Sequence, residues 1–411
     1  VVINEDGHLK DLIVVQEVKR TDRIYAMQFS PDGRHLAVGG YDDAVAIVSL
    51  PTPSNVEIVA EIPTEGLVLS LDWSPDGIYL AIGGSDKRCL IIDTQNKVDW
   101  SIAYEIRRSS PIQALQWHPK TGRYLAIGAN DVAIIDRETF QLRHEVGVNG
   151  KVSGKSRKSN DIFWNVGHSR SHDSTVSRIN NLCWSPTGGY LVINASDGQC
   201  KMLETKSFSP IQDIQRSAKI TSIVWGQHSV IAGVPHRYLA MGGEDKKVVI
   251  LKAGIEISGG TSSIGDDISS SAGSYMSNRG EWVLKENIFR EIDDGSLASM
   301  SAARSPKQSG GTIQALGFSR GSKSRPSAFL ALATGDGVVT IRSTLGWKIL
   351  AQLEFLFSTN CLAFSNGSRM LALGGEDGKV RIVATSPIWT VMKEVNAEAS
   401  IRSIAFSKNN E

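Results

Sequence analysis

Seven aspartates recur at one fixed distance from an apolar segment, and their spacing is the first sign of possible chemistry in this 411-residue chain. Each lies six residues after the leucine that opens a segment such as LAVGG, LAIGG or LALGG. They are Asp42, Asp86, Asp131, Asp197, Asp245, Asp336 and Asp377. An aspartate in a tight turn can accept hydrogen bonds from nearby backbone amides. Because the residue returns in every copy, we interpret these aspartates as structural turn residues that hold hairpins together.

A second motif, NGKVSGKS at residues 149–156, comes within one residue of a phosphate-binding loop. Such a loop needs glycine where Asn149 stands, and it must join a buried strand to a helix whose N-terminus faces the phosphates. The SRKSNDIFWN that follows shows no helical apolar period. We therefore interpret the motif as a basic loop, and we expect no nucleotide or other cofactor.

The spacing of the candidate residues indicates neither a hydrolytic active site nor a metal site. His172, Asp173 and Ser174 are consecutive, whereas a catalytic relay needs side chains that converge from separate elements. Of the eight histidines only His168 and His172 are spaced i, i+4, and they do not form the HExxH motif that holds zinc on a helix. The cysteines lie singly within predicted strands, at Cys89, Cys183, Cys200 and Cys361. We expect no catalytic residue and no metal site, and buried cysteines in a reducing compartment.

The aspartates belong to a unit of four short apolar segments that repeats with a period of roughly 40–45 residues. The first segment of each copy ends in an aromatic residue: Phe29, Trp73, Trp117, Trp184, Trp225, Phe318, Phe364 and Phe406. The segments are rich in Val, Ile, Leu and aromatics and are bounded by turns such as SPDG, which predicts β-strands. Repeats of this length bury their faces only against their neighbours. We therefore predict a single all-β domain over residues 1–411.

This pattern resembles the WD-repeat β-propeller family over nearly the whole chain. The resemblance implies four-stranded blades around a central axis, with the aspartate in the turn from the second to the third strand. The family's Gly-His dipeptide is absent, and no third strand ends in Trp-Asp. Ile92-Asp93 and Ile135-Asp136 come nearest. The resemblance therefore implies the fold together with an incomplete form of the hydrogen-bonded tetrad that uses that His and Trp.

The two ends of the chain each resemble part of one repeat. Residues 1–7, VVINEDG, match LVINASDG at 191–198, which places Asp6 in the aspartate position. Residues 401–407, IRSIAFS, read as a first strand without a second. Joined, the two ends would form a composite closing blade and leave no free sheet edge. We therefore favour eight blades, with seven as the alternative. The sequence begins at Val1 without a methionine and is consistent with a piece of a longer chain.

A first insertion, at about 147–177, is basic and polar but contains Phe163 and Trp164. Large aromatics on a polar loop are exposed unless they dock onto something. These residues form a candidate partner-binding site, in which the aromatics are the anchor and Lys155, Arg157 and Lys158 form the rim. Two alternatives stay open: the aromatics pack back on the propeller, or the loop contacts an acidic membrane surface.

A second insertion, at about 258–311, is rich in Ser and Gly. Its middle, residues 281–292, predicts the displaced outer strand of the fifth blade. Its flanks lack the apolar residues needed to offset ordering entropy, so we expect them to be disordered. Ser305, within Arg304-Ser305-Pro306-Lys307, is a candidate phosphorylation site.

The charge balance of 44 basic and 43 acidic residues excludes a strongly basic nucleic-acid-binding domain. No apolar run approaches the ~18–20 residues of a membrane span, and no signal peptide is visible. We predict a non-catalytic protein–protein interaction scaffold in the cytoplasm or nucleus, with other proteins as partners in a larger assembly and no nucleic acid. The alternative is a membrane-surface or vesicle-trafficking adaptor that uses the basic aromatic loop. An enzyme with a site at the mouth of the propeller channel is a third, less favoured reading.

Overall fold

The structure is a computed structural model, and it describes most of the chain. The described residues are 2–3, 9–11, 17–52, 55–95, 99–147, 177–226, 229–231, 234–253, 275–276, 282–283, 290–292, 311–320, 328–344, 347–385 and 388–407. Every regular element in these ranges is a β-strand. The same ranges contain no helix long and apolar enough to cross a membrane.

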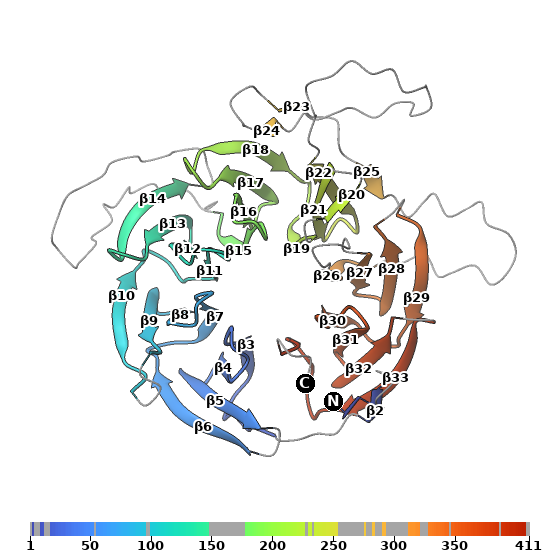
Figure 1. The fold of residues 1–411 in the computed structure, drawn as a ribbon, viewed down its shortest axis with the longest axis horizontal. Coiled ribbons are helices and arrows are strands. Elements are labelled where there is room, and N and C mark those ends of the chain that lie inside the picture. The colour runs from blue at the N-terminus through green and yellow to red at the C-terminus, as the bar shows by residue number, and fades with distance from the viewer. Residues whose placement is uncertain are drawn as a thin grey trace, which may run out of the picture.

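Seven antiparallel sheets stand as blades around a central axis, so the fold is an all-β propeller (Figure 1). In each blade four strands pair in chain order, from the axis outward, and the fifth blade carries one additional short strand. The chain passes round the ring from blade to blade, which brings its two ends close together (Figure 1).

The first four blades are built from consecutive strands. The first blade contains β3 (Ile24–Phe29), β4 (His35–Gly40), β5 (Ala44–Thr52) and β6 (Asn55–Pro63). The second contains β7 (Val68–Trp73), β8 (Tyr79–Gly84), β9 (Arg88–Asp93) and β10 (Ile102–Arg107). The third contains β11 (Ala114–Trp117), β12 (Tyr124–Gly128), β13 (Asp131–Asp136) and β14 (Gln141–Gly147). The fourth contains β15 (Ile179–Trp184), β16 (Tyr190–Ala195), β17 (Gln199–Glu204) and β18 (Pro210–Gln215).

The remaining blades include one interrupted copy. The fifth contains β19 (Ile220–Trp225), β21 (Val234–Gly243), β22 (Val248–Ala253) and β25 (Arg290–Ile292), and β20 (Ser229–Ile231) pairs with β21. The sixth contains β26 (Ile313–Phe318), β27 (Phe329–Thr334), β28 (Val338–Ser343) and β29 (Ile349–Glu354). The seventh contains β30 (Thr359–Phe364), β31 (Met370–Gly375), β32 (Lys379–Ala384) and β33 (Thr390–Asn396). Two separate hairpins are β1 (Val2–Ile3) with β2 (Leu9–Asp11), and β23 (Tyr275–Met276) with β24 (Trp282–Val283).

The prediction of eight blades with a composite closing blade was wrong, and the seven-bladed alternative fits. Among the described residues, segment 401–407 belongs to no sheet, and β1 pairs with β2 instead of with this segment. The physical reason is loop closure. A short hairpin brings its strands together at much lower entropic cost than a pairing between opposite ends of the chain. The fifth blade's outer strand, in contrast, comes from the predicted segment, since β25 pairs with β22.

Segment 401–407 nevertheless lies against the innermost strand of the seventh blade. Asn360 Nδ2 donates to the carbonyl oxygen of Ile401 at 3.2 Å, and the amide of Ile401 donates to the carbonyl oxygen of Gly375 at 3.0 Å. Ile404 and Phe406 pack on the apolar cluster formed by Met370, Ala372 and Ile382. The segment therefore covers the last blade by side-chain contact and a few hydrogen bonds, without becoming part of a sheet.

The core consists of apolar layers between neighbouring blades. One layer combines Val45 and Ile47 of the first blade with Leu71, Leu80 and Ile82 of the second, all at most 7% exposed. Successive residues of a strand point to opposite faces, so each blade contributes to the layer before it and to the layer after it. Neighbouring blades therefore stabilise one another, and a single blade has no complete core.

A glycine near the end of the second strand sets the distance between adjacent blades. In five blades a β-branched residue lies directly over this glycine, at or just before the next first strand or at the start of segment 401–407, because the glycine has no Cβ to exclude it. The pairs are Gly39 with Val68, Gly83 with Ile112, Gly128 with Ile179, Gly242 with Ile313 and Gly374 with Ile401. At the fourth blade Asn194 replaces the glycine and donates its Nδ2 to the carbonyl oxygen of Ile220 at 3.0 Å.

We expect Gly83→Ala to lower the free energy of unfolding by about 1–3 kcal/mol, because the added methyl group overpacks this junction. A Cβ at Gly83 would lie 2.7 Å from Ile112 Cγ2 and 3.0 Å from Leu115 Cδ1. Urea denaturation followed by tryptophan fluorescence measures the change.

Gly189→Ala is the matched control. A Cβ at Gly189 would meet only Thr187 Oγ1, at 3.7 Å, so this variant should stay within about 0.5 kcal/mol of the parent. If the two variants have the same stability, the glycine does not set the distance between the blades.

Candidate functional site

The antiparallel blades give the propeller two different faces. One face carries the turns from the second to the third strand, with the seven aspartates, and the loops between blades; we call it the aspartate face. The other carries the turns from the first to the second strand, including SPDG at residues 30–33 and 74–77; we call it the SPDG face. In these turns Gly33 and Gly77 have φ of 73° and 72°, a conformation that glycine adopts without strain.

The aspartates lie in or directly beside the turns of the aspartate face, and at least four of their carboxylates accept a hydrogen bond from the backbone. The amide two residues further along is the donor in at least four turns. The bonds are Arg88 N to Asp86 Oδ1 (3.1 Å), Gln199 N to Asp197 Oδ1 (3.0 Å), Lys247 N to Asp245 Oδ1 (3.2 Å) and Lys379 N to Asp377 Oδ1 (3.1 Å). This geometry fixes the hairpin at each turn and directs these carboxylates toward the backbone.

Arginines occupy the place of the missing Gly-His dipeptide in several blades. Arg20 Nε lies 2.7 Å from Asp42 Oδ2, and Arg108 Nη2 lies 2.5 Å from Asp131 Oδ1. Each arginine stands in the loop before a first strand, four residues ahead of an isoleucine, as does Arg216. Ile24 and Ile220 open their strands, whereas Ile112 lies two residues before β11. Sequence reasoning missed these pairs, although the repeated Arg-to-Ile spacing was a signal for them.

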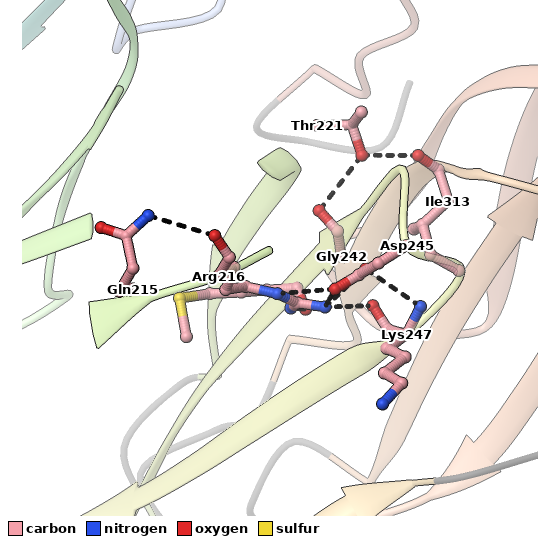
Figure 2. Close-up of polar contacts among 8 residues, drawn as sticks. Gln215, Arg216, Thr221, Gly242, Asp245, Lys247 and Ile313 are labelled. Atoms are coloured by element: carbon pink, nitrogen blue, oxygen red, sulfur yellow. Dashed lines mark hydrogen bonds and ion pairs between the residues drawn. The ribbon is translucent and has the colours of Figure 1, made fainter. Parts of the chain in front are cut away.

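The Arg216 cluster shows how such a pair ties blades together (Figure 2). Arg216 Nη2 lies 2.7 Å from Asp245 Oδ1 and 2.6 Å from Asp245 Oδ2, while Nη1 donates to the carbonyl oxygen of Met241 at 3.0 Å. The two side chains are 5% and 14% exposed. Nearby, the Thr221 hydroxyl donates to the carbonyl oxygens of Gly242 and Ile313, which belong to the fifth and sixth blades. Asp245 of the fifth blade thus has a structural role, because its carboxylate pairs with Arg216.

Arg216→Met should cost about 3 kcal/mol of stability, because it leaves the largely buried carboxylate of Asp245 without its cation. Lys379→Met is the control. The Lys379–Glu394 pair has side chains 39% and 40% exposed, and its loss should cost less than about 1 kcal/mol. Thermal unfolding measures the loss of stability in both variants. Equal losses would show that the burial of an ion pair does not change its contribution to stability.

The innermost strands of neighbouring blades are also linked by polar groups. Trp73 Nε1 donates to the carbonyl oxygen of Gln28 at 3.0 Å, and Gln28 Nε2 donates to Asp72 Oδ1 at 3.3 Å. Asp72 Oδ2 accepts the amide of Trp117 at 2.6 Å. Burial raises the pKa of Asp72 to about 7, while its hydrogen bonds from the amides of Trp117 and Trp73 act in the opposite direction. Asp72 therefore titrates near neutrality at the junction of three blades.

Asp72→Asn should remove one source of pH dependence from the stability. The pKa of Asp72 is higher in the folded protein than in the unfolded chain. Its contribution to the free energy of unfolding is therefore complete below about pH 4 and is lost as the pH rises through about 7. Between about pH 5 and about pH 8, the free energy of unfolding of the variant should therefore rise relative to that of the parent, by at most about 1.4 kcal/mol per pH unit. Urea denaturation of both proteins at the two pH values tests this, and a constant difference would contradict it.

A cavity of about 730 Å³ opens on the aspartate face between the sixth and seventh blades. Hydroxyl and amide groups form most of its wall, with two carboxylates and one guanidinium. The lining residues are Gly311, Thr312, Gln314, Gly335, Asp336, Ser358, Asn360, Glu376, Ser400 and Arg402. The described residues contain no group of three or more His, Cys, Asp or Glu side chains that could hold a metal ion, here or elsewhere. The cavity is suited to binding by hydrogen bonds and charge.

Two apolar side chains stand beside this cavity, on the loop between β29 and β30. Leu356 is 95% exposed and Phe357 is 53% exposed. The loop is fixed at both ends, since Phe355 N donates to the carbonyl oxygen of Gly337 at 2.9 Å and Glu376 N donates to that of Ser358 at 2.8 Å. The fold therefore presents these side chains to solvent on a held loop.

The predicted partner-binding residues are not among those that the structure describes. Phe163, Trp164, Lys155, Arg157 and Lys158 all lie outside the described ranges, and so does Ser305. Sequence reasoning also missed Leu356 and Phe357. Apolar residues continue through residues 355–357 after β29 ends at Glu354, and the sequence alone does not show where this strand ends.

Two family models match parts of the chain. The model described as WD domain, G-beta repeat, matches residues 14–48, 58–93 and 357–383. The model described as Anaphase-promoting complex subunit 4 WD40 domain matches residues 155–228. These matches, together with the propeller fold, support the WD-repeat β-propeller family for this chain. Such propellers generally mediate protein–protein interactions and are generally non-enzymatic.

A solved structure shows a WD-repeat propeller of similar shape. The chain is similar to the crystal structure of Saccharomyces cerevisiae Sqt1, with a TM-score of 0.65 and 14% identity, over 94% of this chain and 88% of that chain. At this identity the likeness concerns the fold alone. No curated protein sequence matches the chain significantly. In this propeller, Arg20, Arg108 and Arg216 stand in the loop where the family's Gly-His dipeptide is usual.

Proposed function

We propose that this WD-repeat propeller is a non-catalytic scaffold that binds a partner protein over the cavity between its sixth and seventh blades. The observation that carries the proposal is the near-complete exposure of Leu356, beside Phe357, on a loop held at both ends. Exposed apolar side chains next to polar groups are typical of protein-binding surfaces. Since the loop is already in place, little conformational entropy is lost on binding.

The surroundings of these two side chains supply the polar rim that such an interface needs. Glu376 and Arg402 are both exposed and line the cavity, so the surface offers charges of both signs. Thr312, Ser358 and Asn360 add hydrogen-bonding groups. An apolar anchor with a polar rim is the usual arrangement of a protein–protein interface.

The basic aromatic loop is a second proposed contact, with Phe163 and Trp164 as its anchor and Lys155, Arg157 and Lys158 as its rim. We further propose that the scaffold works in the cytoplasm or nucleus within a larger assembly, and that Ser305 is a phosphorylation site. The alternative role for this loop is contact with an acidic membrane surface. Flotation with anionic liposomes, comparing Trp164→Ala with the parent, separates the two roles.

The double variant Leu356→Ser, Phe357→Ser should reduce partner recovery about tenfold or more, which corresponds to about 1.4 kcal/mol of binding free energy. Affinity purification with quantitative mass spectrometry measures this recovery. The unfolding midpoint should not fall, since both side chains are exposed.

Ile388→Ser is the matched control for the double variant. Ile388 is 68% exposed and lies between β32 and β33, on the SPDG face. This variant should retain every partner of the parent. A double variant that also retains them all would remove the basis of the proposed function.

A further inference from the structure

The outer strands of the sixth and seventh blades expose apolar side chains on the edge of the disc. Leu350 of β29 is 46% exposed, and Val391 and Met392 of β33 are 38% and 41% exposed. Ile388, in the turn that leads into β33, is 68% exposed. The two strands lie side by side along the edge (Figure 1). We call these four side chains the apolar rim.

A β-bulge in each outer strand explains part of this exposure. The pairing of β29 with β28 skips Leu350, and the pairing of β33 with β32 skips Met392. A bulge leaves the extra residue unpaired and re-aims its side chain. Trp389, in contrast, packs with Ala351 of β29 in the layer between the two blades, and it thereby holds the turn that carries Ile388 against the sixth blade. The apolar rim is therefore fixed by the fold.

The loops of the SPDG face beside the apolar rim contain cations and no carboxylate side chain. In the sixth and seventh blades these loops are residues 319–328, 344–348, 365–369 and 385–389. Together they contain five Lys or Arg residues and no Asp or Glu. The described cations are Arg320, Lys348 and Arg369, and all three are exposed. The loops are in contact, since the Ser368 hydroxyl donates to the carbonyl oxygen of Arg320 at 2.8 Å.

The second blade also exposes an apolar residue on its outer strand, but carboxylates surround it. Ile102, the first residue of β10, is 48% exposed. The SPDG-face loops of that blade contain Asp76 and Asp99. On the seventh blade, the carboxylate of β33 is Glu394, which pairs with Arg381. Exposed apolar side chains and loops with positive charge alone thus coincide at the sixth and seventh blades.

We propose that the apolar rim and the cations beside it bind the surface of an anionic lipid membrane. Apolar side chains on a convex edge fit the soft boundary between headgroups and acyl chains, whereas a partner helix binds in a groove. The cations are attracted to acidic headgroups, and each Lys or Arg near such a surface strengthens binding roughly fivefold. Charge complementarity therefore selects an acidic membrane over a neutral one.

This inference does not rest on the proposed scaffold function. Leu356 and Phe357 lie on the aspartate face, whereas the apolar rim borders the SPDG face. Partner recovery from a detergent extract tests the first surface, and binding of the purified chain to vesicles tests the second. Ile388→Ser should therefore keep its protein partners and lose affinity for vesicles. The failure of either proposal leaves the other intact.

The probe is a vesicle of phosphatidylcholine with roughly 30% phosphatidylserine, and a vesicle of phosphatidylcholine alone is its neutral counterpart. Flotation of the whole purified chain measures the partition coefficient. The chain should bind the acidic vesicle at least about tenfold more tightly than the neutral one. Raising the salt concentration from about 0.05 M to about 0.5 M should weaken this binding at least about tenfold, because salt screens the cations. Equal binding of the two vesicles, or no binding of the acidic one, would overturn the proposal.

Matched variants place the vesicle on the apolar rim. Leu350→Ser with Met392→Ser removes the bulged side chains, and Lys348→Gln with Arg369→Gln removes two cations. Each double variant should weaken binding to the acidic vesicle at least about tenfold. Ile102→Ser is the control, because it removes an exposed apolar side chain that lies beside carboxylates, and it should bind like the parent.

Thermal unfolding confirms that each variant is folded before its loss of binding is interpreted. Ile388→Ser alters an exposed turn and serves if an outer-strand variant unfolds. Folded rim variants that bind the acidic vesicle like the parent would exclude this surface. A loss of binding in Trp164→Ala alone would assign the membrane contact to the basic aromatic loop instead. Binding of polyglutamate without binding of vesicles would indicate an acidic protein partner and would also overturn the proposal.

Discussion

The distance between adjacent blades depends on a contact between a glycine and a branched side chain. A residue such as Ile112 lies over Gly83, where a Cβ would come within 2.7 Å of it. This approach brings the facing strands close enough to bury the apolar layer between them. It also sets where the loops and turns of neighbouring blades meet. The ion pairs of the aspartate face depend on this spacing.

In this propeller, Arg–Asp ion pairs have the structural role that a hydrogen-bonded tetrad with His and Trp has in orthodox members of the family. Arg20, Arg108 and Arg216 bind the aspartate carboxylates of the first, third and fifth blades, each from the loop before its blade. A planar guanidinium offers several donors, so Arg216 binds a carboxylate and backbone carbonyls together. The family's dipeptides can therefore be absent while the hairpin and its neighbour remain connected.

The sequence predicted the strands, the turns and the repeat, because alternation, SPDG and the aspartate spacing are local signals. The prediction of how the ring closes was wrong. The N-terminal segment can pair with β2 in a short hairpin or with residues 401–407 at the other end of the chain, and neither segment alone shows which pairing is more stable. The exposure of Leu356 was missed because it depends on where β29 ends. The Arg–Asp pairs join different repeats, and single-repeat patterns do not reveal such partners.

The segment that covers the seventh blade has a consequence for biosynthesis. Residues 401–407 leave the ribosome after all seven blades, and Ile404 and Phe406 pack on Met370, Ala372 and Ile382. Until then the apolar face of the last blade lacks this cover while the nascent chain is already largely folded. During translation there is thus an interval in which one face of the finished seventh blade is open to chaperones, and the emergence of residues 401–407 closes it.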